Sequence, residues 1–269
     1  MALPSPTADE LAGRALYGER FDAVALAEWF AAETDAYAAL VPDDGENRTA
    51  ALSAHHLLRL LGKRRFARGL ALGPGSGGDY RGLAGRVKGW VAIEPARGFW
   101  TGELAGAPAE FRAPDLDGAL DLPDAACDLA ASFGALHHIA NVSAVVGEIA
   151  RVLVPGAPFL IREPIASLGD FRGPRRGVTR HERGFPHRVM DRILANAGFT
   201  IAHKSFANFP GVRELAWKLG VGFPWNDAGT VRLDAVLSRL MAFNAGYWRS
   251  GLWGRLAPRS CHWLAIRRA

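Results

Sequence analysis

Residues 69–78 read GLALGPGSGG, a short apolar run that leads directly into a glycine-rich turn. The apolar residues predict a buried strand, and the glycines allow a tight turn because no side chain blocks the approach of a ligand to the backbone. A helix that begins after such a turn offers free N–H groups at its start. The spacing of Gly73, Gly75 and Gly78 also fits the dinucleotide pattern G-x-G-x-x-G, so the turn alone leaves the ligand open.

A second strand is predicted at residues 90–93, and it ends at Glu94. A carboxylate in this place can accept hydrogen bonds from both ribose hydroxyls of an adenosine. NAD and S-adenosylmethionine (SAM) both carry that ribose. Glu94 therefore indicates a nucleoside cofactor without choosing between the two.

Short apolar runs alternate with helical stretches through the middle of the chain. Helical spacing covers residues 142–153 and 189–197. The further strands are predicted near residues 110–112, 128–132, 158–161, 199–206 and 262–266. Strands that alternate with helices need crossover connections, which predict an α/β fold with a mostly parallel sheet.

The remaining segments set the expected organisation of a single domain. Residues 1–65 have helical spacing and are expected to form an N-terminal helical cap before an α/β core at 66–206. Residues 207–260 are tryptophan-rich and predict a helical insertion or lid, followed by a last core strand within 261–269.

The composition fits an ordinary globular protein of 269 residues, with 49% hydrophobic and 22% charged residues and a net charge of +5. The basic balance suits anionic partners. Cys127 and Cys261 have no metal-ligand spacing, so we expect no metal site and a reducing, cytoplasmic location. We expect no signal peptide and no transmembrane segment, since no apolar run approaches the ~20 residues that span a bilayer.

Two downstream runs decide between the cofactors. Residues 120–139 read LDLPDAACDLAASFGALHHI, and residues 148–156 read EIARVLVPG. Together they resemble the class I SAM-dependent methyltransferases, in particular the group that contains quinone and small-molecule methyltransferases. The resemblance covers about residues 66–163. It implies SAM as the cofactor and a Rossmann-like α/β fold, with a seven-stranded, mostly parallel sheet whose last strand is antiparallel.

The same resemblance implies the cofactor contacts. Gly73, Gly75 and Gly77 would approach the methionine part of SAM, and Glu94 would hold the ribose. The other implied contacts are Asp115 (or Asp117) and Leu116 with the adenine, Phe133 with the sulfonium and His138 with the cofactor pocket. The chain departs from the family pattern at Ala71, where a carboxylate usually stands, and at Ala157, where a glycine does.

Methyl transfer to a hydroxyl needs a general base at the end of the sheet where the cofactor binds. The candidates are His137 after the fourth strand, Glu163 after the fifth, and His181 in the loop beyond it. A histidine has a pKa near ~6.5 and can accept a proton at neutral pH.

The substrate is indicated by an arginine-rich loop at residues 172–188, because clustered arginines suit phosphates and carboxylates. The stretch 162–184 also resembles methyltransferases of bacterial polysaccharide pathways. We therefore expect O-methylation of a sugar, a glycan or another small anionic substrate, possibly phosphate-bearing. Three alternatives stay open: C- or N-methylation of a natural product, a non-catalytic SAM-fold subunit, and an NAD-dependent dehydrogenase. A nucleic-acid substrate is not expected, since Ser132-Phe-Gly-Ala replaces the amino-methylating N-P-P-Y motif.

Overall fold

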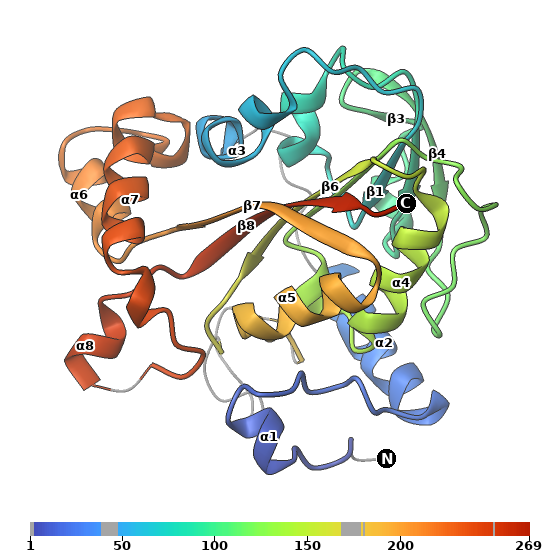
Figure 1. Ribbon diagram of the computed structural model, residues 1–269, viewed down its shortest axis with the longest axis horizontal. Helices are drawn as coiled ribbons and strands as arrows, with labels where there is room; N and C mark the ends of the chain where they lie inside the picture. Colours follow the sequence, from blue (N-terminus) through green and yellow to red (C-terminus); the bar gives the residue numbers. More distant parts are fainter. Residues whose placement is uncertain (1–2, 39–47, 168–178, 180, 250) are drawn as a thin grey trace.

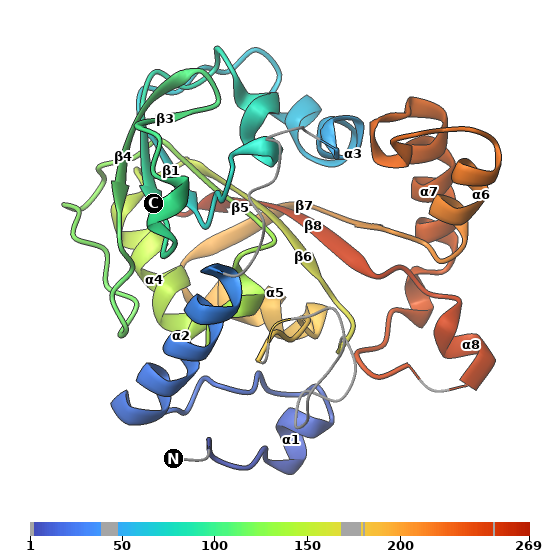
Figure 2. The ribbon, with the colours of Figure 1, turned by 180° about the vertical axis from the view of Figure 1, so that it is seen from behind.

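The computed structural model describes residues 3–38, 48–167, 179, 181–249 and 251–269. A central sheet runs through the molecule, with helices on both faces (Figures 1 and 2). The strands are β1 (Gly69–Leu72), β2 (Trp90–Ile93), β3 (Glu103–Leu104), β4 (Ala107–Arg112), β5 (Leu129–Phe133), β6 (Pro158–Pro164), β7 (Phe199–Ala207) and β8 (Ser260–Arg267).

The strand order is β3-β4-β2-β1-β5-β6-β8-β7. Strands β4, β2, β1, β5 and β6 are parallel, whereas β8 pairs antiparallel with both β6 and β7. The predicted α/β fold with an antiparallel last strand is confirmed. The sheet has eight strands rather than seven, because Glu103–Leu104 turns back through Ala105-Gly106 and pairs with the edge strand β4.

The α-helices lie in layers around this sheet. They are α1 (Ala8–Leu11), α2 (Ala23–Ala38), α3 (Ala50–His56), α4 (Val142–Val152), α5 (His187–Asn196), α6 (Val212–Lys218), α7 (Ala228–Leu240) and α8 (Gly251–Arg255). Helices α2, α4 and α5 cover one face, and α3 lies on the other (Figures 1 and 2). Helices α6, α7 and α8 fall between β7 and β8 in the chain and gather beside the far end of these two strands.

Two apolar clusters fill the spaces above and below the sheet. Leu70 and Leu72 of β1 belong to the cluster under α4 and α5, and Ala71 belongs to the cluster on the opposite face. This alternation is the period-two geometry of a strand. Since both faces are covered, the central strands β1, β2 and β5 are buried at every position, which explains why they appear in the sequence as nearly continuous apolar runs.

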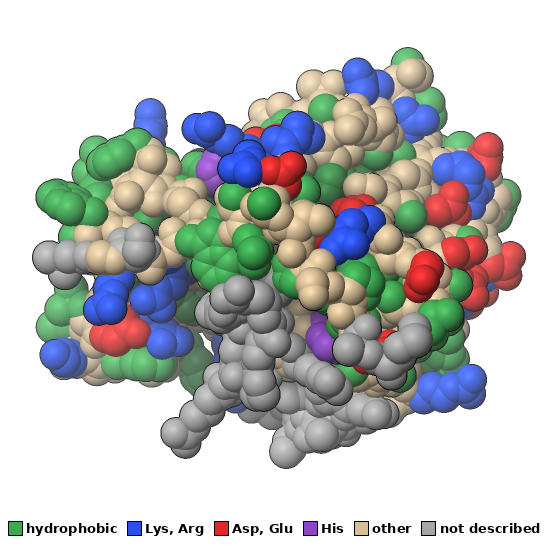
Figure 3. Space-filling model, turned by 90° about the horizontal axis from the view of Figure 1, so that it is seen from below, with side chains coloured by type: hydrophobic (Ala, Val, Ile, Leu, Met, Phe, Trp, Pro, Cys, Tyr) green, Lys and Arg blue, Asp and Glu red, His purple; other side chains and the backbone are tan. Residues whose placement is uncertain are grey.

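The C-terminal helices carry apolar side chains at the surface. Leu219, Leu240, Phe243 and Trp253 are each more than half exposed. Figure 3 shows apolar and basic side chains side by side in this part of the surface, on the left of the view. Within the described parts of the chain, none of the helices is both long and apolar enough to cross a membrane.

Candidate active site

A largely apolar cavity opens at the carboxyl ends of β1, β2, β4 and β5. Its empty volume is about 990 Å³, open solvent included, which is large enough for a nucleoside cofactor. The floor comes from the loops that follow the strands, and helix α2 forms one wall. Five residues predicted from the sequence line it: Gly73, Glu94, Asp115, Leu116 and His138.

The glycine turn depends on glycine at the position where it leaves β1. Gly73 has φ +55°, and a Cβ there would lie 2.5 Å from the Cβ of Ala135. Gly75 also has a positive φ, of +53°. The turn continues into the short 3-10 helix η2 (Gly78–Leu83), about two turns long, rather than into the expected α-helix.

Glu94 ties the glycine turn to the second strand. One of its carboxylate oxygens accepts a hydrogen bond from the backbone N–H of Gly75 at 2.9 Å, and the other accepts one from Ala96 at 2.9 Å. Burial raises the pKa of the Glu94 carboxyl, although both hydrogen bonds oppose the rise. Each oxygen has a further lone pair, so the carboxylate can still accept ribose hydroxyls while it holds the turn.

Three predicted cofactor contacts are placed away from the wall of this cavity. The backbone N–H of Gly75 donates to Glu94, and it is Glu94 that lines the cavity. Gly77 lies beyond the turn, where a Cβ would approach the side chain of Leu104. Phe133 is the last residue of β5, and its ring packs at 5.0 Å from Tyr80 in the cluster on the opposite face of the sheet.

Ala71, where the family pattern has a carboxylate, is fully buried in the same apolar cluster as Tyr80. The hydroxyl of Tyr80 donates to the carbonyl oxygens of Leu72 and Ala131, at 3.2 and 2.8 Å. A hydrogen bond from one side chain thus joins β1 and β5 beneath the glycine turn.

Helix α2 contributes a wall that the sequence did not indicate. Leu26, Trp29, Phe30, Glu33 and Thr34 all line the cavity. Their spacing of three and four residues puts them on one helix face. That spacing was visible in the sequence, but it is equally typical of a helix that packs on a core, so only the tertiary structure assigns this face to the site.

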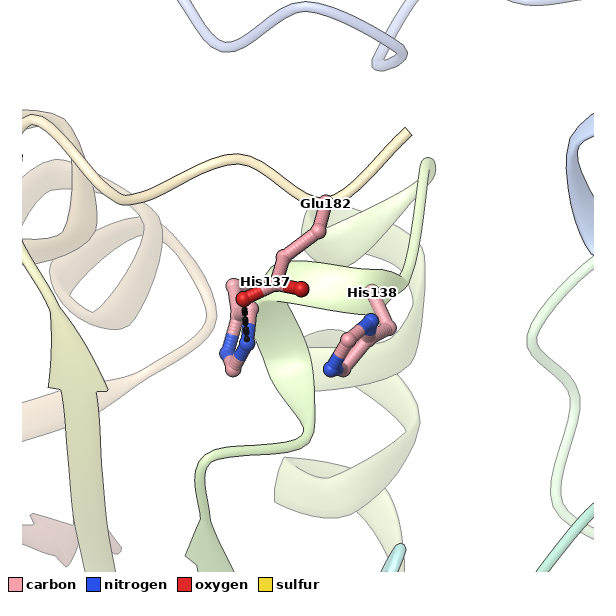
Figure 4. A group of neighbouring side chains, drawn as sticks. All are labelled: His137, His138 and Glu182. Atoms are coloured by element: carbon pink, nitrogen blue, oxygen red, sulfur yellow. Dashed lines mark ion pairs between the residues drawn. The ribbon is translucent and has the colours of Figure 1, made fainter. Parts of the chain in front are cut away.

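His137 lies between two carboxylates (Figure 4). Its Nδ1 is 2.7 Å from Glu163 and its Nε2 is 3.3 Å from Glu182. Burial alone would lower the pKa of His137, but the two carboxylates outweigh it and raise the pKa to about 9. The ring is therefore protonated at neutral pH, and the expectation that His137 acts as a general base is revised.

Glu163 lies within β6 rather than after it, and it is fully buried. Besides contacting His137, it accepts hydrogen bonds from the backbone N–H groups of Ala135 and Leu136, at 3.1 and 2.9 Å. A carboxylate with these three partners holds the loop after β5 in place. These contacts favour a positioning role for Glu163 over the predicted role as a base.

His138 and His181 both contact Glu33 of α2. The Nδ1 of His138 lies 2.8 Å from one oxygen of Glu33, and the backbone N–H of His181 donates to the other oxygen at 2.8 Å. The His181 ring stacks on Trp29 with 4.8 Å between centroids. Burial raises the pKa of Glu33, but the hydrogen bonds from His138, Thr179 and His181 prevail and hold this pKa below its usual value.

A second cavity opens at the ends of β5, β6 and β7. Its empty volume is about 890 Å³, open solvent included. Three arginines line it: Arg162, Arg213 and Arg259. Gly134 lines both cavities, so the two spaces meet at the loop after β5.

Residues 172–178 and 180 of the predicted arginine loop lie outside the described residues. Of its arginines, Arg183 and Arg188 are described; Arg188 is exposed and Arg183 is fully buried. The guanidinium of Arg183 donates to the carbonyl oxygens of His137, Ile139 and Ala140 and so holds the loop after β5 in place.

Comparison with known proteins agrees with this geometry. Residues 70–161 match the family model described as a methyltransferase domain. No curated protein matches the sequence.

Several solved structures are similar in fold. The YcgJ protein from Bacillus subtilis has a TM-score of 0.51 at 16% identity, over 82% of this chain and 98% of that one. The complex between the Haloferax volcanii Trm112 methyltransferase activator and a proposed methyltransferase gives 0.56 at 18%, over 90% and 98%. The N-methyltransferase NodS from Bradyrhizobium japonicum WM9, in complex with S-adenosyl-L-homocysteine, gives 0.51 at 15%, over 87% and 96%.

The solved structures show the same fold. The match of residues 70–161 to the methyltransferase domain shows an enzyme of the SAM-dependent methyltransferase class, with SAM as its cofactor. This sets aside the NAD-dependent and non-catalytic alternatives. The site fits that cofactor, since the glycine turn at Gly73 and the strand-end carboxylate of Glu94 both border the same cavity.

Proposed function

We propose that this enzyme O-methylates a small anionic acceptor, such as a sugar that carries a phosphate or a carboxylate. The observation that carries the proposal is the second cavity, which is lined by arginines and shares Gly134 with the cofactor cavity. An acceptor there would lie next to the cofactor with its charged group held by guanidinium groups.

Two of the three arginines are the better candidates for acceptor binding. Arg162 is already paired with Asp79 at 2.6 Å. Arg259 is exposed just before β8. Arg213 is exposed, pairs with its neighbour Glu214 at 3.1 Å and lies over the ring of Trp217 at 4.8 Å from the centroid. Exposed pairs of this kind are worth little, so an anionic acceptor can displace this one. We therefore assign acceptor binding to Arg213 and Arg259.

The cofactor would be held on the other side of Gly134. In our proposal Gly73 approaches its methionine part, Gly75 and Gly77 shape the turn behind it, and Glu94 holds the ribose. Asp115 and Leu116 contact the adenine, and His138 lies at the wall. Bound SAM supplies an electrophilic methyl group. The chain's own task is to align the acceptor oxygen with that group and to exclude water, which lowers the barrier by roughly 7–11 kcal/mol in favourable cases.

The acceptor oxygen must lose its proton. Of the three predicted bases, we retain His181, because its ring stacks on Trp29 at the wall of the cofactor cavity, whereas His137 and Glu163 are committed to each other. Replacing His181 by asparagine should then lower kcat and leave the KM for SAM within twofold.

A substrate panel tests the proposal. The enzyme is incubated with methyl-labelled SAM and with sugar phosphates, the matching neutral sugars, quinols and amines. Transfer of label to a sugar phosphate, with a lower KM than for its neutral counterpart, is the expected result. Label that reaches only amines or carbon acceptors would favour the N- or C-methylation alternative, for which the aromatic lining of the second cavity at Phe209 and Trp225 offers a surface.

A further inference from the structure

His137, His138 and Glu182 form a cluster that neither cofactor binding nor acceptor binding requires. Each offers one ligand atom, and these atoms all lie within 4.8 Å of one another (Figure 4). Two imidazole nitrogens and one carboxylate oxygen make a ligand set that binds Zn²⁺ and other divalent transition metals. We propose that this triad is a binding site for a divalent transition-metal ion, although the cysteine pattern gave no indication of a metal.

The groups behind the two histidines support this assignment. The Nδ1 of His137 lies 2.7 Å from Glu163, and the Nδ1 of His138 lies 2.8 Å from Glu33. In metal sites a ligating histidine almost always donates its other ring N–H to a carboxylate, which fixes the ring and makes the ligating nitrogen more basic. Here both histidines of the triad have such a carboxylate, each from a different element of the fold.

The geometry around His137 matches this pattern. Its Nε2, the nitrogen that faces away from Glu163, is 3.3 Å from Glu182. Two ligand atoms of one ion, each about 2.0–2.2 Å from the metal, are separated by a similar distance. The His138 ring lies beside that of His137, with 4.1 Å between centroids, so it is close enough to supply the third ligand.

Carboxylates surround the triad. Three of them contact the two histidine side chains: Glu33, Glu163 and Glu182. A divalent cation held by the triad would lie close to all three, and their negative charges would favour its binding.

The position of the triad gives the ion a role that rests on the proposed function. His138 lines the cofactor cavity, and Glu163, the partner of His137, lines the acceptor cavity. An ion between them would bind the acceptor hydroxyl and lower its pKa. The hydroxyl proton would pass to His181, the base proposed above, as the oxygen attacks the methyl carbon and the carbon–sulfur bond breaks with its electron pair going to sulfur.

Metal binding is measured directly on the full chain, with any affinity tag removed. After treatment with EDTA and its removal, the protein is titrated with ZnCl₂ by calorimetry and with CoCl₂ by visible absorption. We expect one equivalent of Zn²⁺ and a cobalt spectrum of nitrogen and oxygen ligation. Glu182→Gln and His138→Asn should each weaken Zn²⁺ binding at least tenfold. Glu33→Gln, which removes a supporting carboxylate, should weaken it by about 10–100-fold.

The matched control is His55→Asn, which removes a half-buried imidazole on α3 outside the triad and should leave Zn²⁺ affinity unchanged. Circular dichroism and urea unfolding show that each variant is folded. A wild-type protein that binds no Zn²⁺ overturns the proposal, as does equal affinity in His138→Asn and His55→Asn. Zn²⁺ binding without methylation of any sugar phosphate would reject the acceptor and keep the metal site. Methylation of a sugar phosphate without Zn²⁺ binding would reject the metal site and keep the acceptor.

Discussion

The carboxylate of Glu94 accepts a hydrogen bond from the backbone N–H of Gly75, at 2.9 Å, and so fixes the glycine turn against the end of β2. The same carboxylate holds Ala96 through its other oxygen. A single buried side chain therefore sets the shape of the turn and also borders the cavity in which the ribose of SAM is expected to lie.

Replacing Glu94 by glutamine should weaken SAM binding at least tenfold and lower the melting temperature. The amide has only one oxygen, so either Gly75 or Ala96 would face an NH₂ group, and a buried donor left without an acceptor costs about 1–3 kcal/mol. Calorimetric titration with SAM measures the loss. Glu110→Gln, on the neighbouring strand β4 but exposed, is the control. Equal SAM affinity in the two variants would contradict the assignment of Glu94.

Alanine at residue 73 should destabilise the protein more than alanine at residue 85. Gly73 and Gly85 both have a positive φ, of +55° and +68°, so a side chain strains the backbone in both variants. Only at residue 73 does the new Cβ meet another atom, 2.5 Å away in Ala135, whereas nothing lies within 4 Å at residue 85. Urea unfolding compares the two. Gly85→Ala should also retain SAM affinity, and a comparable loss of affinity in both variants would refute the tight approach at residue 73.

Arg259→Gln should raise the KM for an anionic acceptor about tenfold or more and leave the KM for SAM nearly unchanged. The reason is that Arg259 lines only the second cavity, and a charge-assisted hydrogen bond contributes about 1.5–3 kcal/mol. Arg239→Gln, an exposed change on α7, is the control. Steady-state kinetics with each substrate varied in turn makes the test. If only the KM for SAM changed, the assignment of Arg259 to acceptor binding would be contradicted.

In metal-free enzyme, the stabilisation contributed by protonated His137 should disappear at alkaline pH. Its pKa is raised from the ordinary 6.5 to about 9, so its contribution is fully present below pH 6.5 and is lost as the pH rises through 9. Glu182 works in the opposite sense. Its carboxyl has a pKa of about 2, so its contribution is present above about pH 4.5 and is lost as the pH falls through 2.

Urea unfolding in EDTA, at several pH values between 6 and 10, measures this dependence. The free energy of unfolding of the wild-type protein, relative to that of His137→Gln, should fall across that range. A difference between the two proteins that does not change with pH would show that His137 is neutral in the folded state.

The sequence was enough to predict the α/β class, the strand ends that carry the glycine turn and Glu94, and the cofactor. These features are local: a strand followed by glycines, or an apolar run that ends in a carboxylate, is specified by a few adjacent residues. The number of strands was one too low, because a two-residue strand such as β3 has no periodicity to detect and exists only through pairing with β4.

The roles of the titratable residues were decided by the tertiary structure alone. His137 and Glu163 both appear in the sequence as candidate bases. Because β5 and β6 are neighbours, the two side chains lie 2.7 Å apart and pair with each other rather than with a substrate. Glu33 and Trp29 reach the site only because α2 crosses the cavity, more than 100 residues away from His138 in the chain. The pKa of a side chain depends on which charges and how much water surround it, and residues far apart in sequence supply both.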